Sequence, residues 1–431
     1  MHINFTHSRY LFWKERRPLL ALITHLFIFC ILYLLFYLFV TNIKLPDTDN
    51  LLNWDATWYY RLKVVGYYYI EGRQNPLVFF PLFPFLWKVT MLDQLGVSVL
   101  NFLLFSISFY FIAKKLALDF LTSLFFLSTP SLFFCYIPYS ESLFFFASTL
   151  ILLGLESNKK NFLLPGIVIA SLTRAVNIIF VPVLIFTYIV TFGYKKRILT
   201  PLLIQILMIF IATLSVFYIQ YYYTGQWFAM FKVQKLWNRS LQIPTLPLTT
   251  LTGSRKLWLD GTALFICILA SYDTLKTIKD GFILRKKSIW TPGALFAMAY
   301  LSIIGILSVF YSGIWPNQEG TSIMSINRYV FSTPFFIYYA YYKFGYQQGK
   351  RLWGELIIVL AITIFCLGGY KTLAGLPSYG ATILYFGLIV GYIILYALCL
   401  KNRKCSILIY MINTIIQVLL FNAFLSNNWV G

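Results

Sequence analysis

The chain has 431 residues, of which 59% are apolar and only 11% carry a charge, whereas a typical soluble domain has about 25% charged residues. This composition excludes an ordinary soluble protein and indicates that lipid surrounds most of the chain. The net charge of +21 does not indicate nucleic-acid binding, because the Lys and Arg residues form short clusters between apolar runs, a pattern that reports membrane topology.

The first predicted element is an uncharged apolar run, residues 19-40, preceded by four basic residues. It is longer than the roughly 7–15 residues of a signal-peptide core, so we expect it to remain as a spanning helix. Runs of about 17–25 apolar residues recur along the chain. They predict an all-α polytopic membrane protein, one integral domain over 1-431 with about 12–13 transmembrane helices. The thirteen expected spans are 19-42, 95-113, 117-136, 142-157, 161-174, 175-193, 198-222, 257-275, 289-313, 328-345, 352-370, 380-400 and 405-425.

The positions of the basic residues predict which loops face the cytoplasm. With a cytoplasmic N-terminus, 22 of the 35 Lys and Arg residues fall in short inward segments, as the positive-inside rule requires. Two longer segments then face outward, 43-94 and 223-256, and we expect them to be the catalytic loop and the substrate loop. Segment 346-431 is expected to contribute only C-terminal transmembrane helices.

The first outward segment is unusually rich in acidic residues. Residues 54-65 suit a short amphipathic helix with Asp55 in its first turn. The helix dipole holds a carboxylate at this position ionised, which suits a base. The alternative is that Asp55 only caps the helix. Spacings of three and four residues place Trp58, Tyr59 and Leu62 on one face.

An aromatic and proline-rich stretch follows, Phe79 to Trp87. It is typical of an interfacial aromatic belt, and a groove for a lipid chain is the alternative. Glu71 lies between the predicted helix and this stretch. We take it as a substrate-binding candidate.

Two isolated charges stand in apolar surroundings further along the chain. An acid at bilayer depth costs a few kcal/mol even on insertion scales, so Glu141 is expected to face a cavity or a partner unless it lies at the interface. Arg174 is similarly isolated, and its planar guanidinium suits a carboxylate or a phosphate. We therefore expect Arg174 either to pair with Glu141 or to bind a phosphate.

The second outward segment brings amide, indole and cationic groups together in Gln234, Trp237 and Arg239. Carbohydrate sites favour an aromatic face with amides around it, and an anionic leaving group needs cations. The alternative is an amphipathic helix lying in the lipid headgroups. Arg328 has the same ambiguity, because it could contact a lipid phosphate or a substrate phosphate.

The cysteines and histidines limit the chemistry further. All three histidines lie near the N-terminus, so the later loops cannot hold a His-based metal site or catalytic triad. We expect no metal and no cofactor. The cysteines lie in or beside apolar runs without CxxC spacing, and we expect core thiols at Cys30, Cys135, Cys267, Cys366, Cys399 and Cys405.

Several motifs occur along the chain in a characteristic order. They are Trp54-Asp55-Ala56, Gly66-Tyr67, Phe79-Phe80-Pro81-Leu82-Phe83-Pro84, Tyr139-Ser140-Glu141-Ser142, Thr173-Arg174, Gln234 with Trp237 and Arg239, and Arg328-Tyr329. Their order resembles that of the PIG-V family, the second mannosyltransferase of glycosylphosphatidylinositol synthesis and its prokaryotic relatives. The resemblance covers residues 50 to about 335.

The resemblance implies a GT-C type glycosyltransferase that uses a polyprenyl- or dolichyl-phosphate-linked sugar, with mannose the expected sugar. It implies an inverting transfer in which Asp55 is the base or orients the acceptor hydroxyl. Arg174, Arg239 and Arg328 are unranked candidates for stabilising the departing phosphate. The expected substrate-binding residues are Trp54, Tyr59, Glu71, Glu141, Arg174, Gln234, Trp237, Arg239 and Arg328.

The expected partners are the lipid-phosphate sugar, a glycolipid or protein-glycan acceptor and membrane lipid, with no nucleic acid. The basic, Ile-, Phe- and Asn-rich composition with compact loops indicates a prokaryotic cell membrane, or the endoplasmic reticulum if the protein is eukaryotic. One alternative is a transporter or flippase of lipid-linked or anionic glycans. Its inverted repeats would give matching halves, whereas here the acids gather in the first outward loop. Another alternative is an O-antigen-ligase-like or protein-glycosylating enzyme.

Overall fold

The computed structural model describes residues 5–249, 258–284, 288–313, 320–346, 349–369 and 378–430. These residues form a bundle of helices with only two very short strands. Eight helices in the described ranges are long and apolar enough to cross a membrane, and a bent pair of helices supplies a ninth candidate. The prediction of an all-α polytopic protein is confirmed, and the chain is a multi-pass membrane protein.

The long helices carry the eight candidate spans. They are α1 (Phe5–Phe39), α4 (Gln94–Lys115), η3 with α8 (Ala175–Ile179 and Phe180–Phe192), α9 (Leu199–Thr224), α11 (Trp258–Ile278), α12 (Pro292–Phe310), α16 (Tyr379–Cys399) and α17 (Arg403–Leu425). The helix predicted from the first apolar run is therefore confirmed as part of α1.

The remaining elements are shorter helices and two strands. They are α2 (Asp55–Val64), η1 (Pro76–Val78), α3 (Leu82–Thr90), α5 (Phe120–Leu127), η2 (Pro130–Tyr136), α6 (Glu141–Ser157), α7 (Lys160–Thr173), η4 (Lys196–Ile198), α10 (Ala229–Leu236), β1 (Ser240–Leu241), η5 (Lys279–Ile283), β2 (Tyr311–Ser312), α13 (Ile326–Phe331), α14 (Pro334–Tyr346) and α15 (Lys350–Cys366).

Among the described residues, fewer helices than the thirteen expected spans are long enough to cross a membrane. The reason is that several predicted spans are broken or short. The expected span 117-136 consists of α5 and η2, and 328-345 consists of α13 and α14. Pro130 and Pro334 lie at these breaks. Proline disfavours helical geometry in the residue before it, which explains why the helices are interrupted there. The bend between η2 and α6 is 105°. Hydropathy averages over such breaks and does not detect them.

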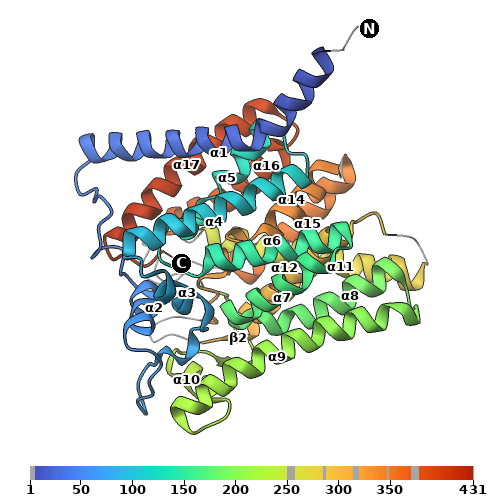
Figure 1. Ribbon diagram of the computed structural model, residues 1–431. Helices are drawn as coiled ribbons and strands as arrows, with labels where there is room; N and C mark the ends of the chain where they lie inside the picture. Colours follow the sequence, from blue (N-terminus) through green and yellow to red (C-terminus); the bar gives the residue numbers. More distant parts are fainter. Residues whose placement is uncertain are drawn as a thin grey trace.

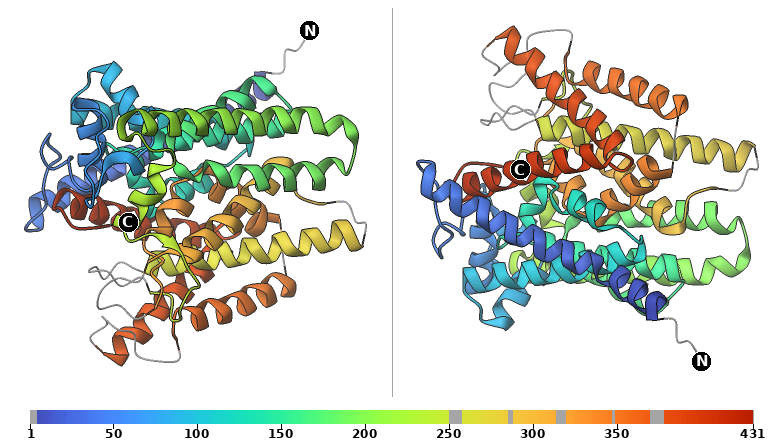
Figure 2. Two further views of the ribbon diagram at one scale, coloured as in Figure 1. Left: turned by 90° about the horizontal axis from the view of Figure 1, so that it is seen from below. Right: turned by 90° about the horizontal axis from the view of Figure 1, so that it is seen from above.

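The helices run across the view of Figure 1, and α2, α3 and α10 gather at its left. We call this the site end of the bundle. The end of α17 lies at the site end, and the beginning of α1 lies toward the other end. Figure 2 shows the same separation from below and above. Because successive helices alternate in direction, the basic clusters Lys114–Lys115, Lys159–Lys160 and Lys195–Lys196 all lie at the end opposite the site.

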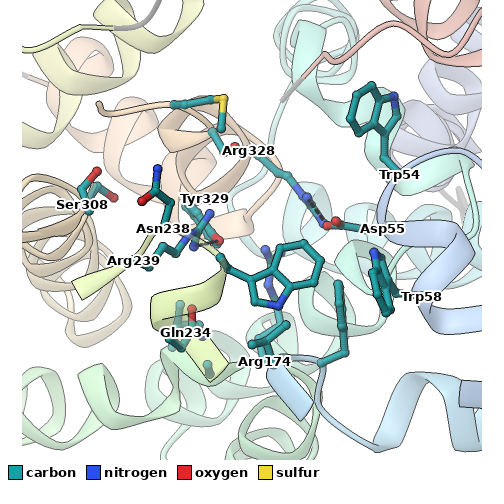
Figure 3. A pocket seen from close by; sticks show the side chains of 18 of the residues that line it. Trp54, Asp55, Trp58, Arg174, Gln234, Asn238, Arg239, Ser308, Arg328 and Tyr329 are labelled. Atoms are coloured by element: carbon teal, nitrogen blue, oxygen red, sulfur yellow. Dashed lines mark hydrogen bonds and ion pairs between the residues drawn. The ribbon is translucent and has the colours of Figure 1, made fainter. Parts of the chain in front are cut away.

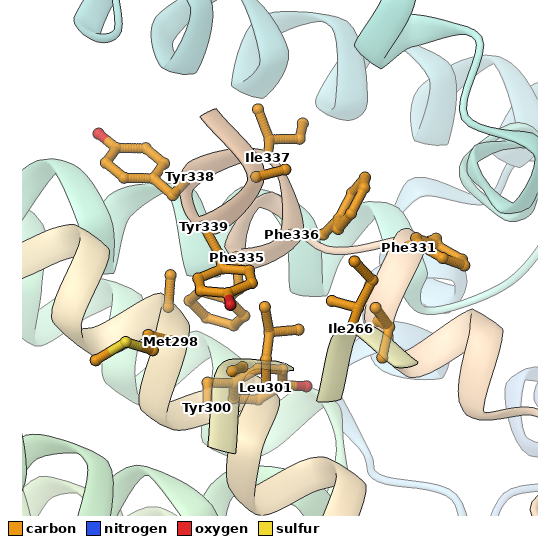
Figure 4. Packing of buried hydrophobic residues seen from close by; sticks show 14 of the residues in the cluster. Ile266, Met298, Tyr300, Leu301, Phe331, Phe335, Phe336, Ile337, Tyr338 and Tyr339 are labelled. Carbon is orange, nitrogen blue, oxygen red and sulfur yellow. The ribbon is translucent and has the colours of Figure 1, made fainter. Parts of the chain in front are cut away.

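Aromatic rings fill the centre of the bundle between α12 and α14 (Figure 4). The rings of Tyr300 and Phe335 have centroids 4.2 Å apart. Helix α11 packs closely on α12, because Gly305 faces Cys267 and a Cβ at this glycine would lie 2.4 Å from the cysteine Cβ. Small residues allow such close helix contacts in membrane proteins. This packed core forms the base on which the site end is built.

Short backbone contacts join the segments of the site end. Strand β1 pairs antiparallel with β2, with Ser240 opposite Ser312. The backbone of Thr321 donates a 2.9 Å hydrogen bond to Thr245. The loop after α10 is thereby attached to the segment that leads into α13.

Candidate functional site

Asp55 is the first residue of α2, as the sequence predicts. Its carboxylate does not cap the helix, because the N-cap residue is Trp54 and no side chain caps this end. Instead, Oδ2 of Asp55 accepts a hydrogen bond from Arg328 at 2.6 Å. The backbone N–H of Asp55 contacts the hydroxyl of Tyr139 at 3.2 Å. The capping alternative for Asp55 is therefore wrong.

Arg328 joins Asp55 to a second carboxylate, that of Glu141. Glu141 is fully buried at the start of α6 and contacts Arg328 through Oε1. The same oxygen accepts from Nη1 of Arg174 at 3.0 Å. The predicted pairing of Arg174 with Glu141 is thus confirmed. We call Asp55, Arg328, Glu141 and Arg174 the site cluster.

Burial and charge fix the ionisation of Arg328. Burial alone would lower the pKa of its guanidinium, but the carboxylates of Glu141 and Asp55 outweigh burial and raise the pKa well above its usual value. The guanidinium also lies 4.5 Å from the ring centroid of Tyr139, a cation–π contact. Arg328 is therefore a fixed positive charge beside Asp55.

Tyr329 lies close to the positive charges of three arginines. Arg239 donates a 3.2 Å hydrogen bond to the Tyr329 hydroxyl, and the Arg174 guanidinium lies 4.9 Å from the ring centroid. Burial tends to raise the pKa of Tyr329, but Arg239, Arg174 and Arg328 together lower it to about 8. This part of the site attracts negative charge.

Tyr59 packs beside the site cluster. Its hydroxyl donates to Oγ of Ser140 at 2.8 Å, next to Glu141 in sequence. Its ring packs on Phe79 and Phe83, with centroids 5.0 and 4.9 Å away. Burial and the carboxylates of Glu141 and Asp55 raise the pKa of Tyr59, so it stays protonated. The aromatic stretch after residue 78 thus helps to position α2.

A cavity of about 1090 Å³ opens beside the site cluster. Figure 3 shows Asp55 between Trp54 and Trp58, with Arg328 reaching it from the opposite wall. Eight of the ten predicted site residues line the cavity: Trp54, Asp55, Tyr59, Arg174, Gln234, Trp237, Arg239 and Arg328. Residues from both predicted outward segments therefore meet in one place.

Two predicted site residues do not line the cavity. Glu141 lies fully buried beneath it and reaches it only through Arg174 and Arg328. Glu71 is exposed in a turn outside the cavity. The substrate-binding role expected for Glu71 therefore has no geometric support.

One wall of the cavity was not predicted from the sequence. Asn427, Asn428 and Trp429, directly after α17, line the cavity, and the rings of Trp429 and Trp54 have centroids 5.0 Å apart. We expected segment 346-431 to supply transmembrane helices alone, and this expectation is wrong for its last residues. An indole beside two amides after an apolar run was the available signal.

The described residues contain no group of three or more His, Cys, Asp or Glu residues that could hold a metal ion. The cysteines are free thiols, and Cys135, Cys267 and Cys399 are buried. The expectation of core thiols is therefore confirmed for these three, but it is wrong for Cys30, which is exposed, and Cys366 and Cys405 are only half-buried. Metal dependence stays a prediction.

Comparisons with known proteins give little independent information. No family model matches the chain, and no curated protein matches it. A solved structure that it resembles is ArnT from Cupriavidus metallidurans bound to undecaprenyl phosphate, with 12% identity, a TM-score of 0.46, and coverage of 93% of this chain and 77% of ArnT. A likeness of this size establishes no shared activity. Membership of the PIG-V family stays a prediction.

Proposed function

We propose that this protein is a GT-C type glycosyltransferase, with Asp55 as its base. It moves a sugar, expected to be mannose, from a polyprenyl-phosphate donor to an acceptor hydroxyl. The observation that carries the proposal is that Asp55, the single carboxylate among the described residues that line the large cavity, shares its wall with three arginines. Displacement at an anomeric carbon needs both groups, a carboxylate for the incoming hydroxyl and cations for the departing phosphate.

The contacts of Asp55 suit a base. Arg328 contacts Oδ2, and this ion pair fixes the orientation of the carboxylate beside the cavity. The acceptor oxygen bonds to the anomeric carbon while its proton passes to Asp55. The bond from that carbon to the phosphate oxygen breaks on the opposite face, and the lipid phosphate leaves with the electron pair. The sugar is therefore transferred with inversion.

The three arginines differ in the number of carboxylates that they contact. This number ranks them as candidate ligands of the donor phosphate. Arg328 contacts two carboxylates and Arg174 contacts one. Arg239 has no carboxylate partner among the described residues and donates to the Tyr329 hydroxyl. Because its charge is the least neutralised, Arg239 is our first candidate for the donor phosphate.

The position of the cavity favours an enzyme over a transporter. Every cavity-lining residue belongs to the site end of the bundle. Arg174 lies over the ring of Phe144 at 5.6 Å, and Phe144 packs with Phe180 and Tyr300 in the core. A transporter needs a path through the bilayer, and this packed aromatic layer lies where that path would run.

The charge distribution supports an outward site. The basic clusters lie at the end opposite the cavity, and positive loops face the cytoplasm. We therefore propose that the N-terminus lies in the cytoplasm and that the site lies on the outer face of the membrane, with a prokaryotic cell membrane as the expected location. The donor lipid then enters the site from the outer leaflet.

The test is transfer of labelled mannose from polyprenyl-phosphate mannose by the purified protein. Asp55→Asn is expected to lower the transfer rate about 10³-fold, the scale of general-base catalysis. Asp49→Asn, in the same loop but exposed, is the matched control and is expected to transfer normally. Normal turnover by Asp55→Asn would exclude Asp55 as the base.

A further inference from the structure

The cavity has two chemically different halves. Three arginines and Tyr329 form a cationic half. We call the other half the aromatic half, and it consists of Trp54, Trp58, Trp237, Asn427, Asn428 and Trp429. The residues of the aromatic half are uncharged at every pH that the protein meets. Asp55 stands between Trp54 and Trp58 (Figure 3).

The indoles of the aromatic half form two pairs on either side of Asp55. Trp54 packs edge-to-face on Trp429 with centroids 5.0 Å apart. Trp58 packs in the same way on Trp237 at 5.3 Å. Edge-to-face pairs hold their rings in fixed positions. The two pairs therefore form a rigid apolar frame around the carboxylate.

The frame also carries unused hydrogen-bond donors. The indole N–H groups of Trp237 and Trp429 are buried, and neither has a partner within the described part of the chain. A buried indole N–H usually finds an acceptor, and leaving it unpaired is unfavourable. Both residues line the cavity. An acceptor supplied by a ligand would satisfy these two donors once the rings shift, because neither nitrogen is exposed to the cavity in this structure.

We propose that the aromatic half is the acceptor subsite and that it binds a neutral carbohydrate, with the segment Asn427–Trp429 as its outer wall. Indole rings cover the apolar face of a sugar, while indole N–H and amide groups pair with its hydroxyls. The absence of charge from the six side chains disfavours a phospholipid headgroup or a basic peptide. This inference rests on the proposed function, because it places the accepting hydroxyl beside Asp55.

The inference separates the two substrates in space. The donor phosphate binds at Arg239 and Tyr329 in the cationic half, and the acceptor sugar binds between the two indole pairs. Changes at Trp429 should then alter acceptor binding without altering donor binding. A purely structural role for Trp429 would change both substrates alike.

The test uses the full-length protein in detergent, with polyprenyl-phosphate mannose as donor and octyl glycosides of neutral hexoses as acceptors. Trp429→Phe keeps an aromatic ring but removes the N–H. We expect it to raise the acceptor KM roughly tenfold, the effect of one lost hydrogen bond, while the donor KM stays unchanged. Asn428→Ala is a second variant, for which we also expect a higher acceptor KM and an unchanged donor KM. Trp227→Phe is the matched control, because Trp227 lies outside the cavity.

Two results would overturn the inference. One is an unchanged acceptor KM in both Trp429→Phe and Asn428→Ala. The other is transfer only to peptides or phospholipids, with no transfer to neutral glycosides. A different result would contradict the proposed function alone. If the wild type transfers no sugar from polyprenyl phosphate, but binds methyl glycosides in a fluorescence titration that Trp429→Phe weakens, the carbohydrate subsite stands and the transferase reaction fails.

Discussion

Two buried ion clusters stand at opposite ends of this bundle, and they differ in whether their charges are fully paired. The site cluster borders the cavity. The second cluster, which we call the closed cluster, joins α11, α14 and α15 near the other end. Its members are Asp273, Lys276, Tyr339, Lys343, Arg351 and Glu355.

Every carboxylate oxygen of the closed cluster has a partner. Lys343, which is fully buried, contacts Asp273 at 2.8 Å and Glu355 at 2.7 Å. Tyr339 donates to the other oxygen of Asp273 at 2.7 Å, and Lys276 contacts the other oxygen of Glu355 at 2.6 Å. None of these residues lines the cavity. Such a cluster fixes helices to one another.

The site cluster is open by comparison. Oε2 of Glu141 is buried without a hydrogen-bond partner among the described residues, and the ion pair of Asp55 with Arg328 uses Oδ2 alone. Three of its members line the cavity. The comparison teaches that burial of charge alone does not identify a functional site. Incomplete pairing beside a cavity is the more informative sign.

The largest effect, a loss of stability, is expected when the closed cluster loses its shared cation. Lys343→Met leaves two buried carboxylates without their shared cation, and breaking a buried pair costs about 3–5 kcal/mol. We expect a large fall in the thermal unfolding temperature, with normal transfer per folded molecule. Lys350→Met is the control, because Lys350 is exposed on α15. Loss of transfer in folded Lys343→Met would mean that the two clusters do not have separate roles.

A smaller effect should come from the arginine without a carboxylate partner. Arg239→Gln removes a charge-assisted contact to the donor phosphate, and we expect the donor KM to rise roughly tenfold to hundredfold. Stability should change little, because no buried carboxylate loses its partner. Lys235→Gln, exposed on α10, is the control in steady-state assays. An unchanged donor KM would assign the phosphate to Arg174 or Arg328.

The smallest effect concerns pH. The hydroxyl of Tyr329 has a pKa of about 8, so it is neutral below pH 8 and becomes a phenolate above it. The phenolate neutralises part of the positive charge of the cationic half. The donor KM should therefore rise a few-fold between about pH 7 and 9. Tyr329→Phe should remove this rise.

Tyr311→Phe is the control for that pH dependence. Tyr311 also lines the cavity, but burial raises its pKa, so it stays neutral through this range. A pH dependence that persists in Tyr329→Phe would assign the titration to another group.

The sequence predicted the parts of the site that depend on local pattern or on charge energetics. Asp55 follows from a helix start, and the pairing of Glu141 with Arg174 follows from the cost of isolated charges in apolar surroundings. It did not predict the wall at Asn427–Trp429. That wall forms by contact between the two distant ends of the chain, which no local pattern records.

The fold was predictable in class but not in detail. Apolar runs indicated a membrane bundle, while the breaks at Pro130 and Pro334 divided expected spans into short helices. Lys343 lies near the end of an apolar run, where a lysine normally indicates topology, yet it is fully buried in the closed cluster. A lysine beside an apolar run has the same sequence pattern whether it faces water or a buried acid.

The most direct test compares one carboxylate from each cluster in the same change, Asp55→Asn against Asp273→Asn. Transfer of labelled mannose per folded molecule and thermal unfolding are measured for both proteins. The account predicts that Asp55→Asn loses transfer about 10³-fold and unfolds near the wild-type temperature, because Arg328 keeps Glu141. It predicts that Asp273→Asn unfolds at a lower temperature and transfers normally. Normal transfer by Asp55→Asn, or loss of transfer by folded Asp273→Asn, would contradict it.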